Sequence, residues 1–267
     1  MILFPWAHHQ FISGIDPRMA SFFTVTTIII SIPFAVIMFA YIATLFKGSI
    51  TLTTPMLWAL GFIAEFLIGG VTGIFLGSSA FDIYAHDTYF VIAHFHYALF
   101  PTVIFGGMTG ITYWFPKFTG KMMNPLLGKT HFWLTTIGFN LLFLPLFFVG
   151  LAGQHRRIFN YSAWPELITQ DLQNLRVAAT IGMLIICFGQ IFLFWNIFIS
   201  LRKGKPAGNN PWNANSLEWV APSPPGHGNF AEIPTVYRGP YEYSVEGEES
   251  DFLPQNQPPT KKEEGSV

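Results

Sequence analysis

Five long apolar stretches, separated by short polar loops, dominate the hydrophobic pattern of the chain. They cover residues 21–46, 55–76, 88–115, 130–150 and 177–201. A bilayer core about 30 Å thick requires roughly 20 apolar residues in a spanning helix, so each stretch is long enough to cross it. The pattern therefore predicts an all-α, polytopic membrane helix bundle with five transmembrane helices.

The two ends of the chain differ from this body. Residues 1–13 are apolar but short, which predicts the end of a further span or an interfacial segment. From residue 204 onward the chain is rich in Pro, Asn, Gly and Glu, a composition too polar to bury a core of its own. We therefore expect a membrane domain at residues 1–203 and an extended, partly disordered inner-face tail at residues 204–267.

The overall composition agrees with a membrane location. Charged residues make up 11% of the chain and hydrophobic residues 51%, whereas soluble domains carry about 25% charge. The net charge of −1 provides no basic face for phosphates, so we expect a lipid bilayer and no nucleic acid as a partner. The single cysteine, Cys187, excludes a disulfide framework and a cysteine-ligated iron–sulfur site.

Basic residues are distributed unequally between alternate loops, which predicts the orientation in the membrane. One side carries Lys47, Lys117, Lys121, Lys129, Arg202, Lys203 and Lys205, and the other carries Arg18, Arg156, Arg157 and Arg176. The side richer in Lys and Arg faces the cytoplasm or its equivalent. We therefore expect the N-terminus and the loops at residues 82–87 and 154–173 to face outward.

Residues 82–97 concentrate ionisable groups at the start of the third span and inside it. Such groups are costly in a membrane and mark ion paths, proton relays or cofactor ligands. His94 and His96 are two residues apart, which on a helix separates them by about 200°. One helix can thus present an axial imidazole to each of two haems. The alternative is a histidine that bonds a neighbouring helix or belongs to a proton relay.

Two adjacent histidines precede the first span on the outward side. Imidazole is a good ligand for copper, so His8 and His9 are candidates for an incomplete copper site. The alternative is an ordinary pair of interfacial histidines.

Charged residues near the outer ends of the spans are further candidates. His86 and Asp87 suit a Mg²⁺ site that is completed by water and another carboxylate, unless Asp87 only caps the following helix. Arg156 and Arg157 are able to hold haem propionates bidentately, or they are lipid-headgroup or loop charges.

Several segments resemble haem-copper oxidase subunit I. They are HDTYFVIAHFHY at residues 86–97, WAHH at 6–9, WALGF at 58–62, GLAGQHRR at 150–157, LEW at 217–219 and SPP at 223–225. The resemblance is to the C-terminal half of that subunit, equivalent to its helices VIII–XII and the tail. The first of these segments is the most specific, and the resemblance covers nearly the whole chain.

The resemblance implies roles for individual residues. His94 would ligate the high-spin haem at the oxygen site, and His96 would ligate the low-spin haem. His8 and His9 would be two of the three ligands of the active-site copper. By the same resemblance, Mg²⁺ would bind at His86 and Asp87, and the haem-propionate region would include Asp82, Arg156 and Arg157.

The resemblance also implies that the remaining ligands lie in an N-terminal half that this sequence does not contain. We therefore expect a split subunit I, active only with the chain that carries that half. The expected enzyme is a terminal oxidase that reduces O₂ to water and takes up or translocates protons. Its cofactors would be two haems of type a, b or o, copper and magnesium. Its partners would be oxidase subunits II and III and cytochrome c or quinol, in a bacterial cytoplasmic or mitochondrial inner membrane.

Two departures from the family concern proton transfer. Phe34 and Ile37 stand where the family usually carries a threonine and a proton-channel lysine, and neither side chain can relay a proton. Glu65 lies in the middle of the second span, where the family is normally apolar. We expect Glu65 to serve a substitute proton path or a subunit contact. The lost channel residues also motivate an alternative function, a non-catalytic structural or assembly subunit.

Overall fold

The computed structural model describes residues 5–242, 245, 248–249 and 252–258. The regular secondary structure of the described residues is helical, with no strand among them beyond two isolated bridge pairs. Five helical segments have the length and apolarity to span a membrane, which confirms the predicted fold class. They are Pro17–Leu45, Thr54–Gly77, Tyr89–Thr119, Pro125–Leu151 and Gln170–Lys203. Residues 1–4 and 259–267, the outermost parts of the predicted N-terminal segment and tail, lie outside the described residues.

The first span consists of two helices, α1 (Pro17–Ile29) and α2 (Ser31–Leu45), which follow the short helix η1 (Pro5–Gln10). Asp16 caps α1 by accepting a hydrogen bond from the Arg18 N–H at 2.8 Å. Pro33 has no N–H to offer the carbonyl of Ile29, the residue at which α1 ends. The proline thus explains why this span is interrupted.

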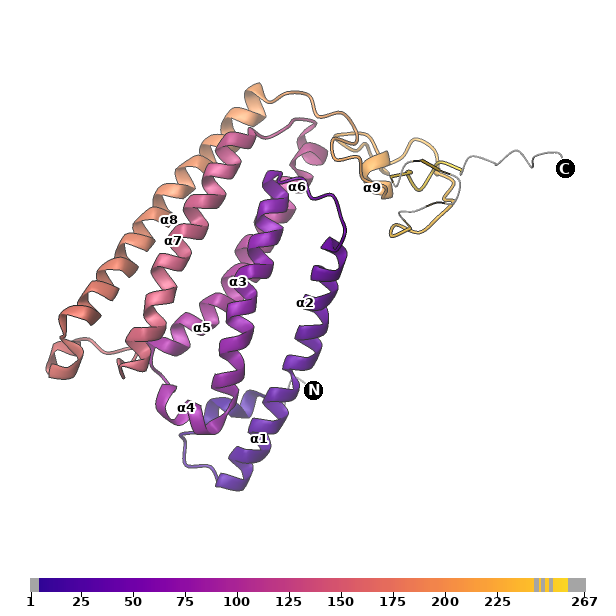
Figure 1. Ribbon diagram of the computed structural model, residues 1–267. Coiled ribbons are helices and arrows are strands. Elements are labelled where there is room, and N and C mark those ends of the chain that lie inside the picture. Colours follow the sequence, from indigo (N-terminus) through magenta and orange to yellow (C-terminus); the bar gives the residue numbers. More distant parts are fainter. Residues whose placement is uncertain (1–4, 243–244, 246–247, 250–251, 259–267) are drawn as a thin grey trace. The chain divides into compact units, whose positions relative to one another are not determined.

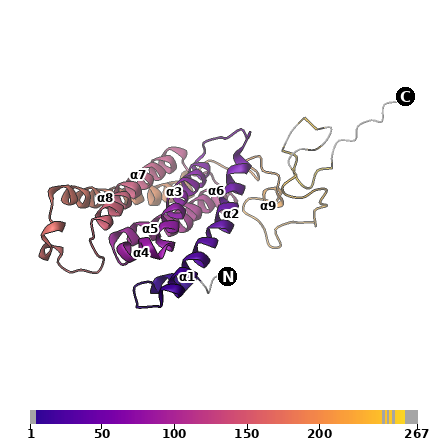
Figure 2. The same ribbon diagram turned by 60° about the horizontal axis from the view of Figure 1, so that its bottom comes forward.

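The third span changes its helical pitch at a proline. It follows α3 (Thr54–Gly77) and α4 (Ser79–Ala85), and it contains α5 (Tyr89–Phe100), the π-helical turn η2 (Pro101–Phe105) and α6 (Gly106–Thr119). Pro101 lacks an N–H, and the Gly106 N–H returns to the Pro101 carbonyl across the wider turn. Figure 2 shows α4 close to α1 and α3, against which it packs.

The last two spans are α7 (Pro125–Leu151) and α8 (Gln170–Lys203), joined by the short turns η3 (Tyr161–Ala163) and η4 (Pro165–Leu167). They run side by side, and at Gly138 a Cβ would lie 2.8 Å from the Gly182 carbonyl oxygen (Figure 1). Two glycines therefore allow this close approach.

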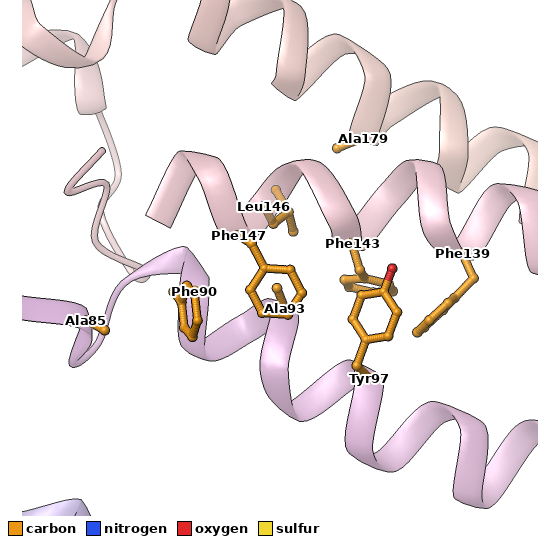
Figure 3. Close-up of a cluster of buried hydrophobic side chains, with 9 residues drawn as sticks. All are labelled: Ala85, Phe90, Ala93, Tyr97, Phe139, Phe143, Leu146, Phe147 and Ala179. Atoms are coloured by element: carbon orange, nitrogen blue, oxygen red, sulfur yellow. The ribbon is translucent and has the colours of Figure 1, made fainter. Parts of the chain in front are cut away.

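Aromatic side chains from α5 and α7 form the main core. Phe90 and Tyr97 of α5 face Phe139, Phe143 and Phe147 of α7 (Figure 3). The Tyr97 ring lies 4.8 Å from that of Phe139 in an edge-to-face arrangement, which aromatic pairs favour. This core fixes the position of α5, the helix that carries His94 and His96.

The contacts divide the chain into two compact units. One contains residues 1–110 and 128–193, and the other contains residues 111–127 and 194–267. The second unit includes the short helix α9 (Leu217–Val220) and groups the tail with the adjacent helix ends. The predicted boundary after residue 203 stays a prediction, because a grouping of contacts does not measure independent folding.

Polar groups organise the described part of the tail. The Arg238 guanidinium donates hydrogen bonds to the carbonyls of Leu253 and Pro254 at 3.0 Å and of Gln257 at 2.6 Å. Lys117, near the end of α6, is 5% exposed and donates to the carbonyls of Ala221 at 2.6 Å and Asn209 at 3.1 Å. Its ammonium also lies 5.0 Å from the centre of the Trp219 ring.

Lys117→Met is therefore expected to loosen residues 209–221. The variant keeps most of the side-chain volume but leaves the buried Ala221 carbonyl and the Asn209 carbonyl without their charged donor, which costs about 1–3 kcal/mol. Hydrogen exchange followed by mass spectrometry should show faster exchange in this segment. Lys203→Met, at the exposed end of α8, is the matched control and should leave the exchange unchanged. Equal exchange in both variants would contradict the anchoring role of Lys117.

Candidate metal and haem site

The turn before α5 sets the direction of the helix. Asp87 adopts a left-handed backbone conformation with φ of 55°, which Asp tolerates better than most residues. Thr88 is the N-cap, and its hydroxyl accepts a hydrogen bond from the Phe90 N–H at 3.2 Å. The proposal that Asp87 only caps the helix is therefore wrong, because Thr88 has that role. The Asp87 carboxylate does not cap the helix and can therefore bind other groups.

His94 points toward α3. Its Nδ1 lies 3.1 Å from the Thr72 hydroxyl, which itself lies 2.9 Å from the Ile68 carbonyl and 3.0 Å from the Gly69 carbonyl. Because the hydroxyl donates its one proton to a carbonyl, it accepts from the Nδ1–H of His94. In the neutral ring, Nε2 then carries the free electron pair. A Cβ at Gly73 would lie 2.9 Å from the imidazole Cε1, so α3 closely packs against this ring.

His96 points toward α7 instead. Its Nδ1 lies 2.8 Å from the Ile92 carbonyl, which can only accept, so Nδ1 carries the proton and Nε2 the electron pair. The ring stacks on Phe143 with a centroid distance of 4.0 Å and an interplanar angle of 18°. One helix thus presents two imidazoles to different neighbours, each with Nδ1 engaged and Nε2 available to a metal.

His8 and His9 lie on η1, and their ring centroids are 4.3 Å apart. The His8 Nδ1 lies 3.3 Å from the Thr27 hydroxyl of α1. Burial, together with the charges of His9 and His94, lowers the pKa of His8 to about 4. The His8 ring is therefore neutral at physiological pH, which is the form that binds a metal.

The outer end of α4 and the loop after α7 bring the other predicted residues together. His86 Nδ1 lies 2.9 Å from an Asp82 carboxylate oxygen, and His86 Nε2 lies 4.0 Å from Asp87. Arg156 donates to Asp87 from Nε at 2.7 Å, and Arg157, which is 73% exposed, has a nitrogen 3.7 Å from Asp87. The Arg156 N–H also bonds the Asp87 carbonyl at 2.7 Å.

The two carboxylates in this region differ in environment. Burial raises the pKa of Asp82, and the hydrogen bond and charge of His86 only partly oppose that effect. Burial also acts against ionisation of Asp87, but Arg156, His86 and Arg157 together hold the pKa of that carboxyl below its usual value. Asp87 is therefore ionised at neutral pH, which suits a hard cation.

The sequence did not identify the partners that orient these groups. Thr72 and Ile92 fix the two imidazoles in α5, and Asn140 of α7 bonds Glu65. The spacing of Gly69 and Gly73 on α3 is a signal for close approach of another helix, but not for a hydroxyl partner at Thr72. Within the described residues no three His, Cys, Asp or Glu side chains gather as a metal cluster, so any metal here needs further ligands.

Comparisons with known proteins identify the family of the chain. Residues 1–214 match the family model described as cytochrome c and quinol oxidase polypeptide I. The chain is 45% identical, over 256 residues, to the alternative cytochrome c oxidase subunit 1 of Bradyrhizobium diazoefficiens, covering 95% of this chain and 43% of that relative. It is 43% identical, over 244 residues, to cytochrome c oxidase subunit 1 of Thermostichus vulcanus, covering 91% of this chain and 43% of that one.

A solved structure shares the fold. It is a chain of a heme-copper terminal oxidase dimer determined by cryo-electron microscopy, with a TM-score of 0.61 and 19% sequence identity, covering 74% of this chain and 39% of that one. The chain spans less than half the length of these relatives. By the family match and the sequence identities, the protein belongs to the cytochrome c and quinol oxidase polypeptide I family.

Proposed function

We propose that this chain forms the C-terminal part of the catalytic subunit of a terminal oxidase that reduces O₂ to water at a haem-copper centre. The observation that carries the proposal is the arrangement of α5, which directs His94 toward α3 and His96 toward α7 with Nε2 of each ring available. Family membership supports it, because subunit 1 of cytochrome c oxidase is the relative that the chain matches over 91–95% of its own length.

The donor set fits the expected metals. Neutral imidazole nitrogens suit both haem iron and copper. His94 would hold the high-spin iron and His96 the low-spin iron. His8 and His9 would be two of the three ligands of the active-site copper. When bound, iron and copper would pass electrons from the external donor to O₂. The contribution of Thr72 and the Ile92 carbonyl is to fix each ring and its tautomer, as partners of metal-binding histidines generally do.

The outer end would bind the charged parts of the cofactors. His86 Nε2 and the ionised Asp87 are 4.0 Å apart, and we assign them to Mg²⁺, completed by water and ligands from elsewhere. Arg156 and Arg157 would hold haem propionates through charge-assisted hydrogen bonds. Asp82 would orient His86 through its hydrogen bond of 2.9 Å.

The missing ligands would come from the part of the subunit that corresponds to the first half of the relatives, in the same or a second polypeptide. The complete enzyme would contain two haems of type a, b or o, and would work with oxidase subunits II and III. Electrons would come from cytochrome c or quinol, in a bacterial cytoplasmic or mitochondrial inner membrane. Protons would be taken up, and translocated, from the inner side.

Purification of the intact complex through a tag on this chain tests the proposal. Reduced-minus-oxidised spectra and a metal count should show two haems and copper, and the sample should consume O₂ with a suitable donor. Phe34 and Ile37 are the observation that favours a non-catalytic assembly subunit instead. A complex that contains the chain but lacks haem in contact with it would contradict the oxidase proposal and support that alternative.

A further inference from the structure

Glu65 is the buried carboxyl in α3 that the metal-site assignments do not use. It is 5% exposed, and its Oε1 accepts a hydrogen bond from the Asn140 amide at 2.6 Å. The Asn140 oxygen in turn accepts from the Tyr97 hydroxyl at 2.8 Å. The second carboxyl oxygen, Oε2, is buried and has no hydrogen-bond partner in the described part of the chain. A polar atom left in this state inside a membrane is energetically unfavourable.

Other buried polar atoms without a partner lie inward of Glu65 on α3 and α7. They are Nε1 of Trp58, Nε2 of His131 and the hydroxyl of Thr136. Thr136 is one turn before Asn140 on α7, on the same helix face. Trp58 is seven residues before Glu65 on α3, about 10 Å along the axis and again on the same face. The Trp58 and His131 rings are 5.1 Å apart.

These atoms belong to two helices that run in the same direction. Gly128 meets Thr54 near the start of both helices, and Glu65 meets Asn140 further along. By the predicted orientation, the start of both helices is the inner side. The unsatisfied polar atoms therefore follow one another from the inner end toward Glu65. Ordered water is the usual partner of buried polar groups that lack a protein partner.

Outward from Glu65, α3 approaches α5, the helix that carries His94 and His96. Thr72, whose hydroxyl contacts the His94 imidazole, is seven residues further along α3, about 10 Å outward on the same face. Tyr97 lies one turn inward of His94 on α5, and its hydroxyl is already linked to Glu65 through Asn140. Glu65 thus stands between the inner end of the helix pair and the proposed oxygen site.

Helix α2, the neighbour of α3, carries Phe34 and Ile37, neither of which can carry a proton. The Phe34 ring of α2 lies 6.0 Å from the ring of Phe66, which follows Glu65 on α3. Ile37 is aliphatic and carries no group that exchanges a proton. A proton that must reach the outer half of the membrane needs a polar path, and these polar groups belong to α3 and α7, which the Asn140–Glu65 hydrogen bond joins.

We propose that Glu65 is the proton-carrying group of an uptake path along the α3–α7 interface that serves the oxygen site. The inference rests on the proposed oxidase function. A proton from the inner water reaches Oε2 through water bound by Thr136 and its neighbours, converting the carboxylate to the acid. The O–H bond then breaks, the proton passes outward through water toward Thr72 and His94, and the carboxylate is restored. Only O–H bonds form and break.

Glu65→Gln in the intact complex separates proton transfer from a structural role. Glutamine can still accept from Asn140, so the packing is kept, but it cannot release a proton at neutral pH. We expect O₂ consumption to fall about 100-fold, the lower end of what a positioned proton-transfer group supplies, with unchanged haem spectra. Glu65→Asp should retain part of the activity. Glu166→Gln, at an exposed position of η4, is the matched control and should have no effect.

Infrared difference spectroscopy gives a readout that a structural role would not change. During reduction of the unmodified complex, we expect a carboxylic acid band that shifts in D₂O, moves in Glu65→Asp and disappears in Glu65→Gln. Full O₂ consumption in Glu65→Gln, or a band that survives it, would overturn the inference while leaving the oxidase proposal intact. Absence of haem or of O₂ consumption in the unmodified complex would instead overturn the oxidase proposal. If Glu65→Gln fails to assemble, an unchanged band in Glu65→Asp would also overturn the inference.

Discussion

Replacing His96 with asparagine is expected to remove the low-spin haem spectrum and to reduce O₂ consumption to background. Replacing His94 should instead remove the carbon monoxide-binding, high-spin haem. An asparagine amide offers no nitrogen electron pair to iron, and the two rings contact different helices, His94 at Thr72 of α3 and His96 at Phe143 of α7. The two losses should therefore be separable in reduced-minus-oxidised and carbon monoxide difference spectra.

His227→Asn is the matched control for these variants, because His227 lies exposed in the tail. It should leave both spectra and the O₂ consumption unchanged. If His94→Asn and His96→Asn both kept two complete haem spectra, the histidines of α5 would be structural, and the assignment of this helix as the ligand helix would be wrong.

Gly69→Ala is expected to separate α3 from α5 and to destabilise the ligand helix. A Cβ at this position would lie 2.6 Å from the backbone carbonyl of Tyr97 and 2.7 Å from the Ala98 nitrogen. Backbone atoms cannot rotate away, so the helices must move, at a cost of about 1–3 kcal/mol or more. The variant should lose its haem spectrum at a lower temperature than the unmodified complex and assemble in lower yield.

Gly70→Ala is a stringent control because it makes the same change one residue away on the same helix. No atom lies within 4 Å of the Cβ that it would add. Alanine is also favoured over glycine inside a helix by about 1 kcal/mol. Gly70→Ala should therefore be neutral or slightly stabilising. Equal thermal stability of the two variants would show that the close approach at Gly69 does not hold α5 in place.

Much of the fold follows from hydropathy, because a membrane span needs a fixed length of apolar residues. The interruption at Ile30 and the π-helical turn at Pro101 were not predicted, although both prolines were visible in the sequence. A proline removes one hydrogen bond, but the surrounding packing decides whether the helix breaks, bends or widens. The burial of Lys117 depends on carbonyls about 90 and 100 residues away in the sequence, which local patterns do not report.

The candidate site, like the fold, was predictable from the sequence only in part. Helical periodicity alone separates the directions of His94 and His96, since two residues correspond to about 200°. The partners Thr72 and Ile92, which fix the tautomer of each ring, depend on tertiary contact or on detailed backbone geometry. Glu65 stands out in the sequence as an acid in an apolar span, whereas its link through Asn140 to Tyr97 joins three helices and becomes visible only in the fold.

A cryo-electron microscopy map of the assembled complex, purified from its native membrane, tests the central claim most directly. The account predicts a planar haem bonded to Nε2 of His94 on one side of α5 and a second haem bonded to Nε2 of His96 on another side. It also predicts a metal ion at His8 and His9. A map in which either Nε2 faces lipid or another side chain, with no haem bonded to it, would contradict the assignment of α5 as the helix that ligates both haems.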